Sequence, residues 1–240
     1  MSYLPELIFL LVIFLTNIVQ SISGFAGTVI AMPFSLLLVG ADVAKPILNA
    51  VALFVTIWIA IKFRKNIDWK DVFKMIIFMG IGFGLGFLIP KSFSEHKMIL
   101  KFYGLLITLI AVFFATQDIE KLHIPDWILY FILIFAGLIH NQFVSGGPLV
   151  VIYARLKIKD KNTFRASLSF IWVILNSILL VSHITTGLFD LKNLIIVVIS
   201  LATGTIATVI GIRIASKINL EWFMKITYLL LFISGFILLV

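Results

Sequence analysis

The sequence contains no cysteine and very little charge. Without cysteine, the chain can form no disulfide bond, no thiolate metal site and no thiol nucleophile. Charged residues make up only 12% of its 240 residues, about half the fraction in an ordinary soluble domain. With 62% hydrophobic residues and a mean hydropathy of +1.18, the chain has too little polar surface to cover a water-exposed globule. The composition therefore predicts an integral membrane protein.

Eight stretches of the chain lack Asp, Glu, Lys and Arg and form hydropathy peaks. They are residues 7–41, 46–61, 75–90, 102–117, 127–154, 166–189, 193–212 and 226–240. Because these runs are longer than the roughly ten residues of a barrel strand, we expect an all-α fold, a polytopic transmembrane helical bundle. As single helices the first and fifth runs would be about 50 Å and about 42 Å long, whereas the hydrocarbon core is about 30 Å thick. Both runs are therefore predicted to fold back as broken-helix hairpins, which gives about ten helical segments.

The two halves of the chain resemble each other. A shift of 120 residues superposes Ala26 and Gly27 on Gly146 and Gly147, Asp42 on Asn162, and Lys45 on Arg165. The order of long and short apolar runs is also the same in both halves. We therefore expect two transmembrane repeats, residues 1–120 and 121–240, which together form one membrane domain. Each would contain one hairpin and three further helices, an odd number of crossings, so the repeats would be inverted.

Basic residues predict the orientation of this bundle. If each hairpin returns to the side where it started, 14 of the 19 Lys and Arg residues share one face. These are the basic residues at 62–74 and 155–165, with Lys121, Arg213, Lys217 and Lys225. Hairpins that do not return would give a weaker positive-inside bias, so we expect both termini outside. The net charge of +8 is then explained by the orientation of the protein in the membrane. It does not indicate nucleic-acid binding, because the basic residues form no single stripe.

The breaks in the two hairpins are rich in Ser, Asn, Gln and Gly. Their sequences are QSISGFAGTVIAMP at 20–33 and HNQFVSGGPLVVIY at 140–153. Irregular backbone at membrane depth persists only where protein or a watered cavity satisfies its polar groups. The short helices after the breaks would begin inside the membrane with exposed N–H groups and positive dipole ends, and Pro148 suits a first helical position. The two breaks are therefore predicted to meet at a midplane anion site.

Glycine also allows helices to pack closely in a bilayer. For Gly24, Gly27, Gly146 and Gly147 we prefer the backbone of a binding site, with close packing as the alternative. For Gly80, Gly82, Gly84 and Gly86, which are spaced by two along one helix, we prefer close packing.

Three segments of the chain resemble a known family. They are SGFAGTVIAMPFSLLLVGADVAKPILNAVA at 23–52, SGGPLVVIYARL at 145–156 and FRASLSFIWVILN at 164–176. These segments are similar to the sulfite exporter TauE/SafE family, also called the toluene sulfonate uptake permeases. The resemblance covers nearly the whole chain. The first turn departs from the more glycine-rich family pattern at Phe25, Ala26 and Thr28. The resemblance implies transport of sulfur-containing oxyanions, such as sulfite or organosulfonates, across the cytoplasmic membrane.

A sulfite or sulfonate group offers several acceptor oxygens and no strong donor. Its partners are therefore backbone N–H groups and the side chains of Ser, Asn, Gln and Arg. The expected substrate-binding residues are Gln20, Ser23, Gly24, Gly27, Asn49, Asn141, Gln142, Ser145, Gly146, Gly147, Pro148 and Asn176. Asn49 and Asn176 could instead bond another helix.

Two cations occupy matching positions after the short helices. Lys45 and Arg165 could attract anions at the two entrances, or could be snorkelling residues that set the topology. Arg165 is the stronger candidate, because its fork matches an oxyanion bidentately.

His140 is the only titratable side chain next to a break. It is our candidate for a proton-coupling residue, with a neutral, hydrogen-bonded packing histidine as the alternative. No two histidines have metal-ligand spacing with a carboxylate, so we expect no metal, and we expect no cofactor.

The sequence thus predicts a proton-coupled secondary transporter with a small anionic substrate and membrane lipid as its partners. An enzyme is not expected, because every acid lies near the boundary of an apolar run. A nucleotide-binding Gly-x4-Gly-Lys-Ser/Thr loop is missing, so we expect no binding of ATP, which supports a secondary transporter. The alternative is an anion channel, or a carrier for a non-sulfur organic anion.

Overall fold

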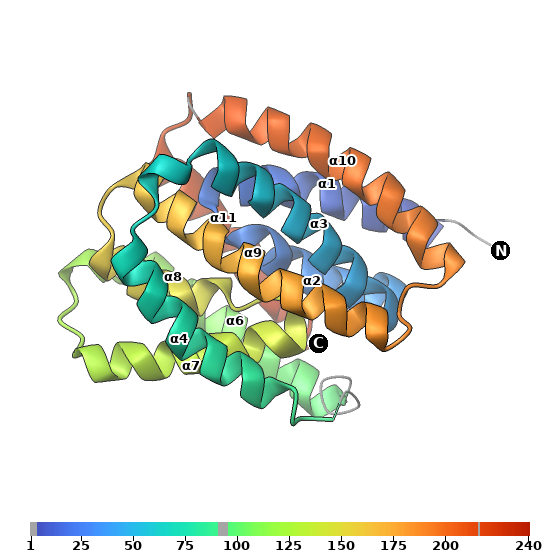
Figure 1. Ribbon diagram of the computed structural model, residues 1–240, viewed down its shortest axis with the longest axis horizontal. Helices are drawn as coiled ribbons and strands as arrows, with labels where there is room; N and C mark the ends of the chain where they lie inside the picture. The colour runs from blue at the N-terminus through green and yellow to red at the C-terminus, as the bar shows by residue number, and fades with distance from the viewer. Residues whose placement is uncertain (1–3, 91–95, 216) are drawn as a thin grey trace.

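The computed structural model describes residues 4–90, 96–215 and 217–240, and the regular structure of these residues is helical. The α-helices of these residues are α1 (Leu4–Ser23), α2 (Ala26–Val39), α3 (Ala41–Lys62), α4 (Trp69–Gly86), α6 (Lys97–Thr116), α7 (Asp126–Phe143), α8 (Gly147–Lys157), α9 (Lys161–Thr185), α10 (Leu191–Ala215) and α11 (Leu220–Phe236). Two 3-10 turns, η1 (Arg64–Asn66) and η2 (Ile119–Lys121), lie in connections. Among the described residues, α1, α3, α6, α7, α9 and α10 are long and apolar enough to cross a membrane. The predicted polytopic helical bundle is confirmed (Figure 1).

Both long apolar runs are broken. Helix α1 ends at Ser23, and Gly24 adopts a φ of 85° before α2 begins. Helix α7 ends at Phe143, and Val144 adopts a left-handed φ of 54° before α8 begins at Gly147. A left-handed β-branched residue is strained by about 1–3 kcal/mol, a cost that clusters at functional sites. Because α8 starts at Gly147, Pro148 is its second residue, one position later than predicted.

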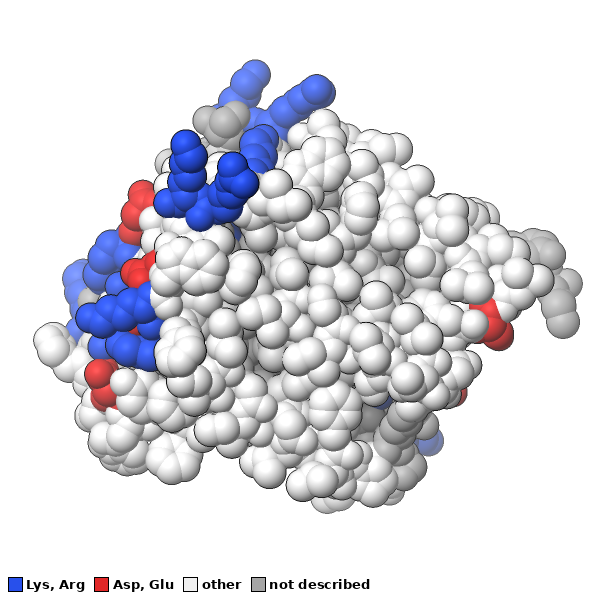
Figure 2. Space-filling view, viewed as in Figure 1, with Lys and Arg blue, Asp and Glu red and all other residues white. Residues whose placement is uncertain are grey.

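The two ends of the bundle differ in charge. The connections at 63–68, 117–125 and 158–160 lie at one end, which we call the basic end (Figure 1). The backbone N–H of Asp68 donates to Ser167 Oγ at 3.0 Å, and Lys157 pairs with Asp126 at 2.7 Å across this end. Figure 2 shows Lys and Arg side chains gathered there. The start of α1 and the connections at Gly40 and 186–190 lie at the opposite end (Figure 1).

Helices from the two halves of the chain pack against each other. Helix α1 packs against α10, α4 against α7, α3 against α9 and α6 against α11. Under the predicted duplication α1 matches α7 and α4 matches α10, so the first two contacts are equivalent. The other two contacts pair a helix with its own counterpart. This pairing is compatible with a two-fold duplication, and both the duplication and the inverted repeat stay predictions.

Glycine brings two of these helix pairs close together. A Cβ added at Gly82 of α4 would collide with the carbonyl oxygen of Ile134 in α7. A Cβ at Gly211 of α10 would lie 2.7 Å from Ser21 Cβ of α1. Bilayer helices associate through such close packing, because lipid supplies no hydrophobic driving force between them.

The packing prediction for the glycines of α4 is right for two of them and wrong for two. Besides Gly82, Gly86 lies close to α7, since its added Cβ would be 2.6 Å from Asn141 Cβ. A Cβ at Gly80 or Gly84 would meet no described atom within 4 Å. These two glycines lie on the other side of the helix, where a side chain would enter open space.

Candidate functional site

The structure brings the two breaks together. A Cβ added at Gly147, the first residue of α8, would lie 2.7 Å from the carbonyl oxygen of Phe25, which immediately precedes α2. From this point α2 runs to Gly40 at the opposite end, and α8 runs to Lys157 at the basic end (Figure 1). The two short helices therefore begin at one place and point away from each other.

A small polar cavity lies where the breaks meet. Its volume is about 10 Å³, which is room for about one water molecule. We call five of its lining residues the central cluster: Gln20, Thr56, His140, Trp172 and Asn176. The shift of 120 residues found in the sequence pairs three positions of this lining: Gln20 with His140, Ala52 with Trp172, and Thr56 with Asn176. Both halves of the chain thus contribute to the cavity, at positions that the predicted repeat makes equivalent.

Gln20 and His140 make equivalent interactions in the two breaks. Gln20 Oε1 accepts the backbone N–H of Gly27 at 2.8 Å. His140 Nδ1 accepts the backbone N–H of Gly146 at 3.5 Å, and its Nε2 lies 3.0 Å from Asn176 Oδ1. With Nδ1 as an acceptor and Nε2 as a donor, the hydrogen-bond network assigns a neutral imidazole. Each side chain therefore accepts a hydrogen bond from one backbone N–H group at the start of a short helix.

The donors at the start of α2 are not exposed. Ser23 Oγ accepts the backbone N–H groups of Phe25 at 3.3 Å and Ala26 at 3.2 Å. Since Gln20 accepts the N–H of Gly27, the prediction of exposed N–H groups is wrong for these three residues. The reason is that the polar side chains of the break cap its own helix. A ligand that uses these donors must first displace a capping side chain.

Asn49 and Asn176 connect α3 to α9. Asn49 Nδ2 donates to the carbonyl oxygen of Asn176 at 3.2 Å, which is the interhelical bond considered from the sequence. Asn49 Oδ1 is buried without a hydrogen-bond partner among the described residues. Beside them, Trp172 donates from Nε1 to the carbonyl oxygen of Gly24 at 3.2 Å, and its ring centroid lies 4.9 Å from that of His140. Asn176 therefore belongs to the central cluster, and Asn49 supports it.

A larger cavity of about 250 Å³ lies toward the opposite end of the bundle. We call it the vestibule, and its polar lining includes Asp42, Lys45, Asn141, Gln142, Ser182 and His183. Gln142 Nε2 donates to Asn141 Oδ1 at 2.9 Å and to the carbonyl oxygen of a neighbouring glycine in α4 at 2.8 Å. Asn141 and Gln142 thus line the vestibule rather than the meeting point of the breaks, where they were expected. Lys45 lies in the vestibule, as an entrance charge would.

Arg165 lies on the other side of the first break, in the second turn of α9 at the basic end. Its guanidinium carbon is 5.1 Å from the centroid of the Phe63 ring, and a Cβ at Gly24 would lie 3.5 Å from Arg165 Cγ. Only 6% of the residue is exposed. Its Nε and Nη2 have no hydrogen-bond partner in the described part of the chain. A buried charge without a partner is costly, so this guanidinium is suited to receive an anion.

The remaining predicted residues belong to the internal structure of the second break. Ser145 Oγ donates to the carbonyl oxygen of Phe143 at 2.7 Å. A Cβ at Gly146 would collide with the carbonyl oxygen of Ala136, so this glycine permits α8 to lie close to α7. Neither Ser145 nor Pro148 lines the central cavity or the vestibule.

Thr56 and Trp172 were missed in the sequence, although a signal for them is present. Thr56 lies opposite Asn176 under the shift of 120 residues, and Trp172 lies four residues before Asn176 in the same helix. Extending the repeat alignment to the helices after the breaks would have found both.

Broken helices that meet around a polar cavity in a multi-pass helical bundle are typical of secondary transporters. The family model described as Sulfite exporter TauE/SafE matches residues 9–238. The chain therefore belongs to the sulfite exporter TauE/SafE family, a family of membrane transporters of sulfite and related sulfur compounds. This confirms the resemblance seen in the sequence. Comparisons with curated proteins and with solved structures found no match.

Proposed function

We propose that the protein is a secondary transporter that moves sulfite or organosulfonates across the cytoplasmic membrane, with the central cluster as its substrate site. The observation that carries the proposal is the meeting of two short-helix N-termini at a polar cavity lined by equivalent residues of both halves. Helix N-termini favour anions, because their N–H groups and dipoles point toward the ligand. Membership of the family supports a sulfur oxyanion as that ligand.

The cations suggest the route of the anion. Lys45, which lines the vestibule together with Asp42, attracts it at the opposite end. Arg165, beyond the first break, receives it on the way to the basic end. A guanidinium can bond two oxygens of a sulfite or sulfonate group at once.

The described conformation is closed around the proposed site. A cavity of about 10 Å³ holds no sulfite ion, since that volume fits about one water molecule. Gln20 and His140 keep it closed, because they accept the N–H groups of Gly27 and Gly146. Oxyanion oxygens are acceptors too, so the substrate replaces these side chains as the two breaks separate.

His140 couples this exchange to a proton. When the anion takes the N–H of Gly146, Nδ1 of His140 loses its hydrogen bond and becomes free to accept a proton. The resulting imidazolium lies beside the bound anion and is stabilised by it. Anion binding and protonation therefore favour each other, which is the requirement for coupled movement.

The proposal is tested by flux into proteoliposomes with sulfite, sulfate, thiosulfate, short sulfonates and a carboxylate control, each with and without a pH gradient. Asn176→Leu should raise the KM for sulfite about tenfold, because it removes the polar amide from the cluster and replaces it with an apolar side chain of similar size. Thr208→Val is the matched control: Thr208 is a buried polar residue of α10 that lines neither the central cavity nor the vestibule. Equal transport of the carboxylate would contradict the substrate class, and flux that does not saturate would indicate a channel.

A further inference from the structure

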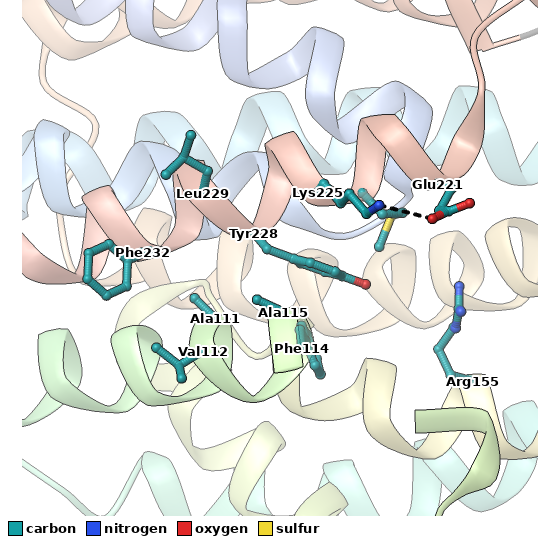
Figure 3. Close-up of a pocket in the computed structure, with 11 residues that line it drawn as sticks. Ala111, Val112, Phe114, Ala115, Arg155, Glu221, Lys225, Tyr228, Leu229 and Phe232 are labelled. Atoms are coloured by element: carbon teal, nitrogen blue, oxygen red, sulfur yellow. Dashed lines mark ion pairs between the residues drawn. The ribbon is translucent and has the colours of Figure 1, made fainter. Parts of the chain in front are cut away.

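A groove of about 700 Å³ runs between α6 and α11, apart from the cavities already described. Figure 3 shows that α6 and α11 supply most of the side chains lining it and that α8 supplies one, Arg155. The groove shares no lining residue with the vestibule or the central cavity. It therefore requires an explanation of its own.

The polar side chains of the groove lie together at one end. Arg155, Glu221, Lys225 and the hydroxyl of Tyr228 are at this end in Figure 3. Lys225 pairs with Glu221 at 3.0 Å, and both side chains are mostly exposed, at 68% and 78%. Such a surface pair is weak and easily rearranged. With Arg155 the end carries two cations and one carboxylate, a net charge of +1.

This polar end lies at the basic end of the bundle. Arg155 belongs to the last turn of α8, and Lys157 of the same turn pairs with Asp126 at the start of α7. In a multi-pass protein the basic end faces the cytoplasm. We therefore expect the polar end of the groove to lie at the depth of the lipid headgroups in the cytoplasmic leaflet.

The rest of the groove is apolar and open to the side. Val112, Leu229 and Phe232 line it at the end away from Arg155 (Figure 3). Their exposed fractions are 43%, 58% and 37%. On the outer surface of a membrane bundle, exposed apolar side chains at this depth contact lipid chains. The groove thus combines a charged end in the headgroup region with an apolar floor that runs into the hydrocarbon core.

We propose that this groove binds one anionic phospholipid of the cytoplasmic leaflet. The phosphate of this lipid lies between Arg155 and Lys225 and accepts a hydrogen bond from the Tyr228 hydroxyl. One acyl chain packs against Val112 and Phe232. A free inorganic anion would gain nothing from the apolar floor, and a net charge of +1 favours an anionic headgroup over a zwitterionic one. The proposal does not depend on the transported substrate.

The experiment is native mass spectrometry of the purified full chain, titrated with phosphatidylglycerol or with phosphatidylcholine of the same acyl chains. One phosphatidylglycerol should bind more tightly than phosphatidylcholine. Arg155→Gln and Lys225→Gln should each weaken phosphatidylglycerol binding about fivefold. Lys65→Gln, an equal change of charge at the basic end but outside the groove, should leave it unchanged. Ala115→Trp, which fills the groove and keeps every charge, should abolish the tight site.

Several outcomes would overturn the proposal. Equal losses in Lys65→Gln and Arg155→Gln would mean that the surface potential alone attracts the lipid. Tight binding that persists in Ala115→Trp would place the lipid elsewhere. A dimer without lipid that dissociates in Ala115→Trp would make this face an interface between two copies of the chain. Because lipid binding is read by mass, a failure here is distinguishable from a failure of the transport proposal.

Discussion

Replacing Gly147 with alanine should slow transport without unfolding the protein. The new Cβ would lie 2.7 Å from the carbonyl oxygen of Phe25 and 3.3 Å from its Cβ. Real Cβ atoms do not approach backbone oxygen so closely, so the two breaks must separate slightly. Overpacking of this kind costs about 1–3 kcal/mol. The cost falls on the closed conformation, in which the breaks touch. Because the empty transporter must pass through this conformation in each cycle, we expect the maximal transport rate to fall about five- to 150-fold.

Two other glycines provide matched controls for this substitution. Gly84→Ala adds the same methyl group to an exposed helix position where no described atom lies within 4 Å. It should leave transport unchanged and stabilise α4 by about 0.5–1 kcal/mol. Gly82→Ala creates a collision with Ile134 in the contact between α4 and α7. It should lower the yield of folded protein, while the molecules that fold transport normally.

The assay is sulfite uptake per folded protein, with the folded amount measured by size-exclusion chromatography before reconstitution. The expected result is a large loss of rate for Gly147→Ala and no loss for Gly84→Ala. If Gly147→Ala transports at the wild-type rate with an unchanged KM, the meeting point of the breaks is not part of the transport pathway. A loss of folded protein in Gly147→Ala that accounts for the whole loss of uptake would make this glycine a packing residue.

Three further predictions concern coupling, the inner cation and the topology. His140→Gln places in the second half the residue found at the matching position of the first half, Gln20. The variant should exchange labelled sulfite down its gradient but should lose the stimulation of transport by a pH difference. Full stimulation would make His140 a structural residue. Arg165→Gln should fold as well as the wild type, because it removes a buried charge whose Nε and Nη2 have no described hydrogen-bond partner. It should raise the KM for sulfite about ten- to 100-fold, and an unchanged KM would make Arg165 a topology residue. Lys45→Cys and Lys65→Cys should be labelled by a membrane-impermeant maleimide from opposite sides, with no background from native thiols, and labelling from one side would exclude the inverted topology.

The broken helices could be predicted because length alone demands them. A run as long as residues 7–41 cannot cross the bilayer as one helix, so it must turn within the membrane. The polar composition of the run then locates the turn near Gly24. These arguments rest on fixed dimensions of helices and bilayers, and they need no knowledge of neighbouring helices.

The direction in which each side chain of the break points could not be predicted in the same way. Treating HNQ at 140–142 as part of the break placed all three side chains at one site. In the structure α7 continues to Phe143, so consecutive side chains point about 100° apart around the helix. His140 therefore faces the central cavity, whereas Asn141 and Gln142 face the vestibule.

The glycines of α4 also show that the side of a helix on which a residue lies decides its role. A spacing of two residues turns about 200° around a helix, so neighbours in such a series lie on opposite sides. Gly82 and Gly86 share the side that packs against α7, and Gly80 and Gly84 share the other. The sequence shows the series, but only the packing shows which members of it matter.

The opposed short helices α2 and α8 also have a consequence for electrostatics. Each helix carries a partial positive charge of about half an elementary charge at its first turn, and this charge arises from peptide dipoles rather than from an ionisable group. The two first turns adjoin at Phe25 and Gly147, so their potentials add at one point of a low-dielectric interior. No proton can neutralise this field. Attraction of the anion at the centre should therefore persist at every pH at which the fold persists, while any dependence on pH must come from a side chain or from the anion itself.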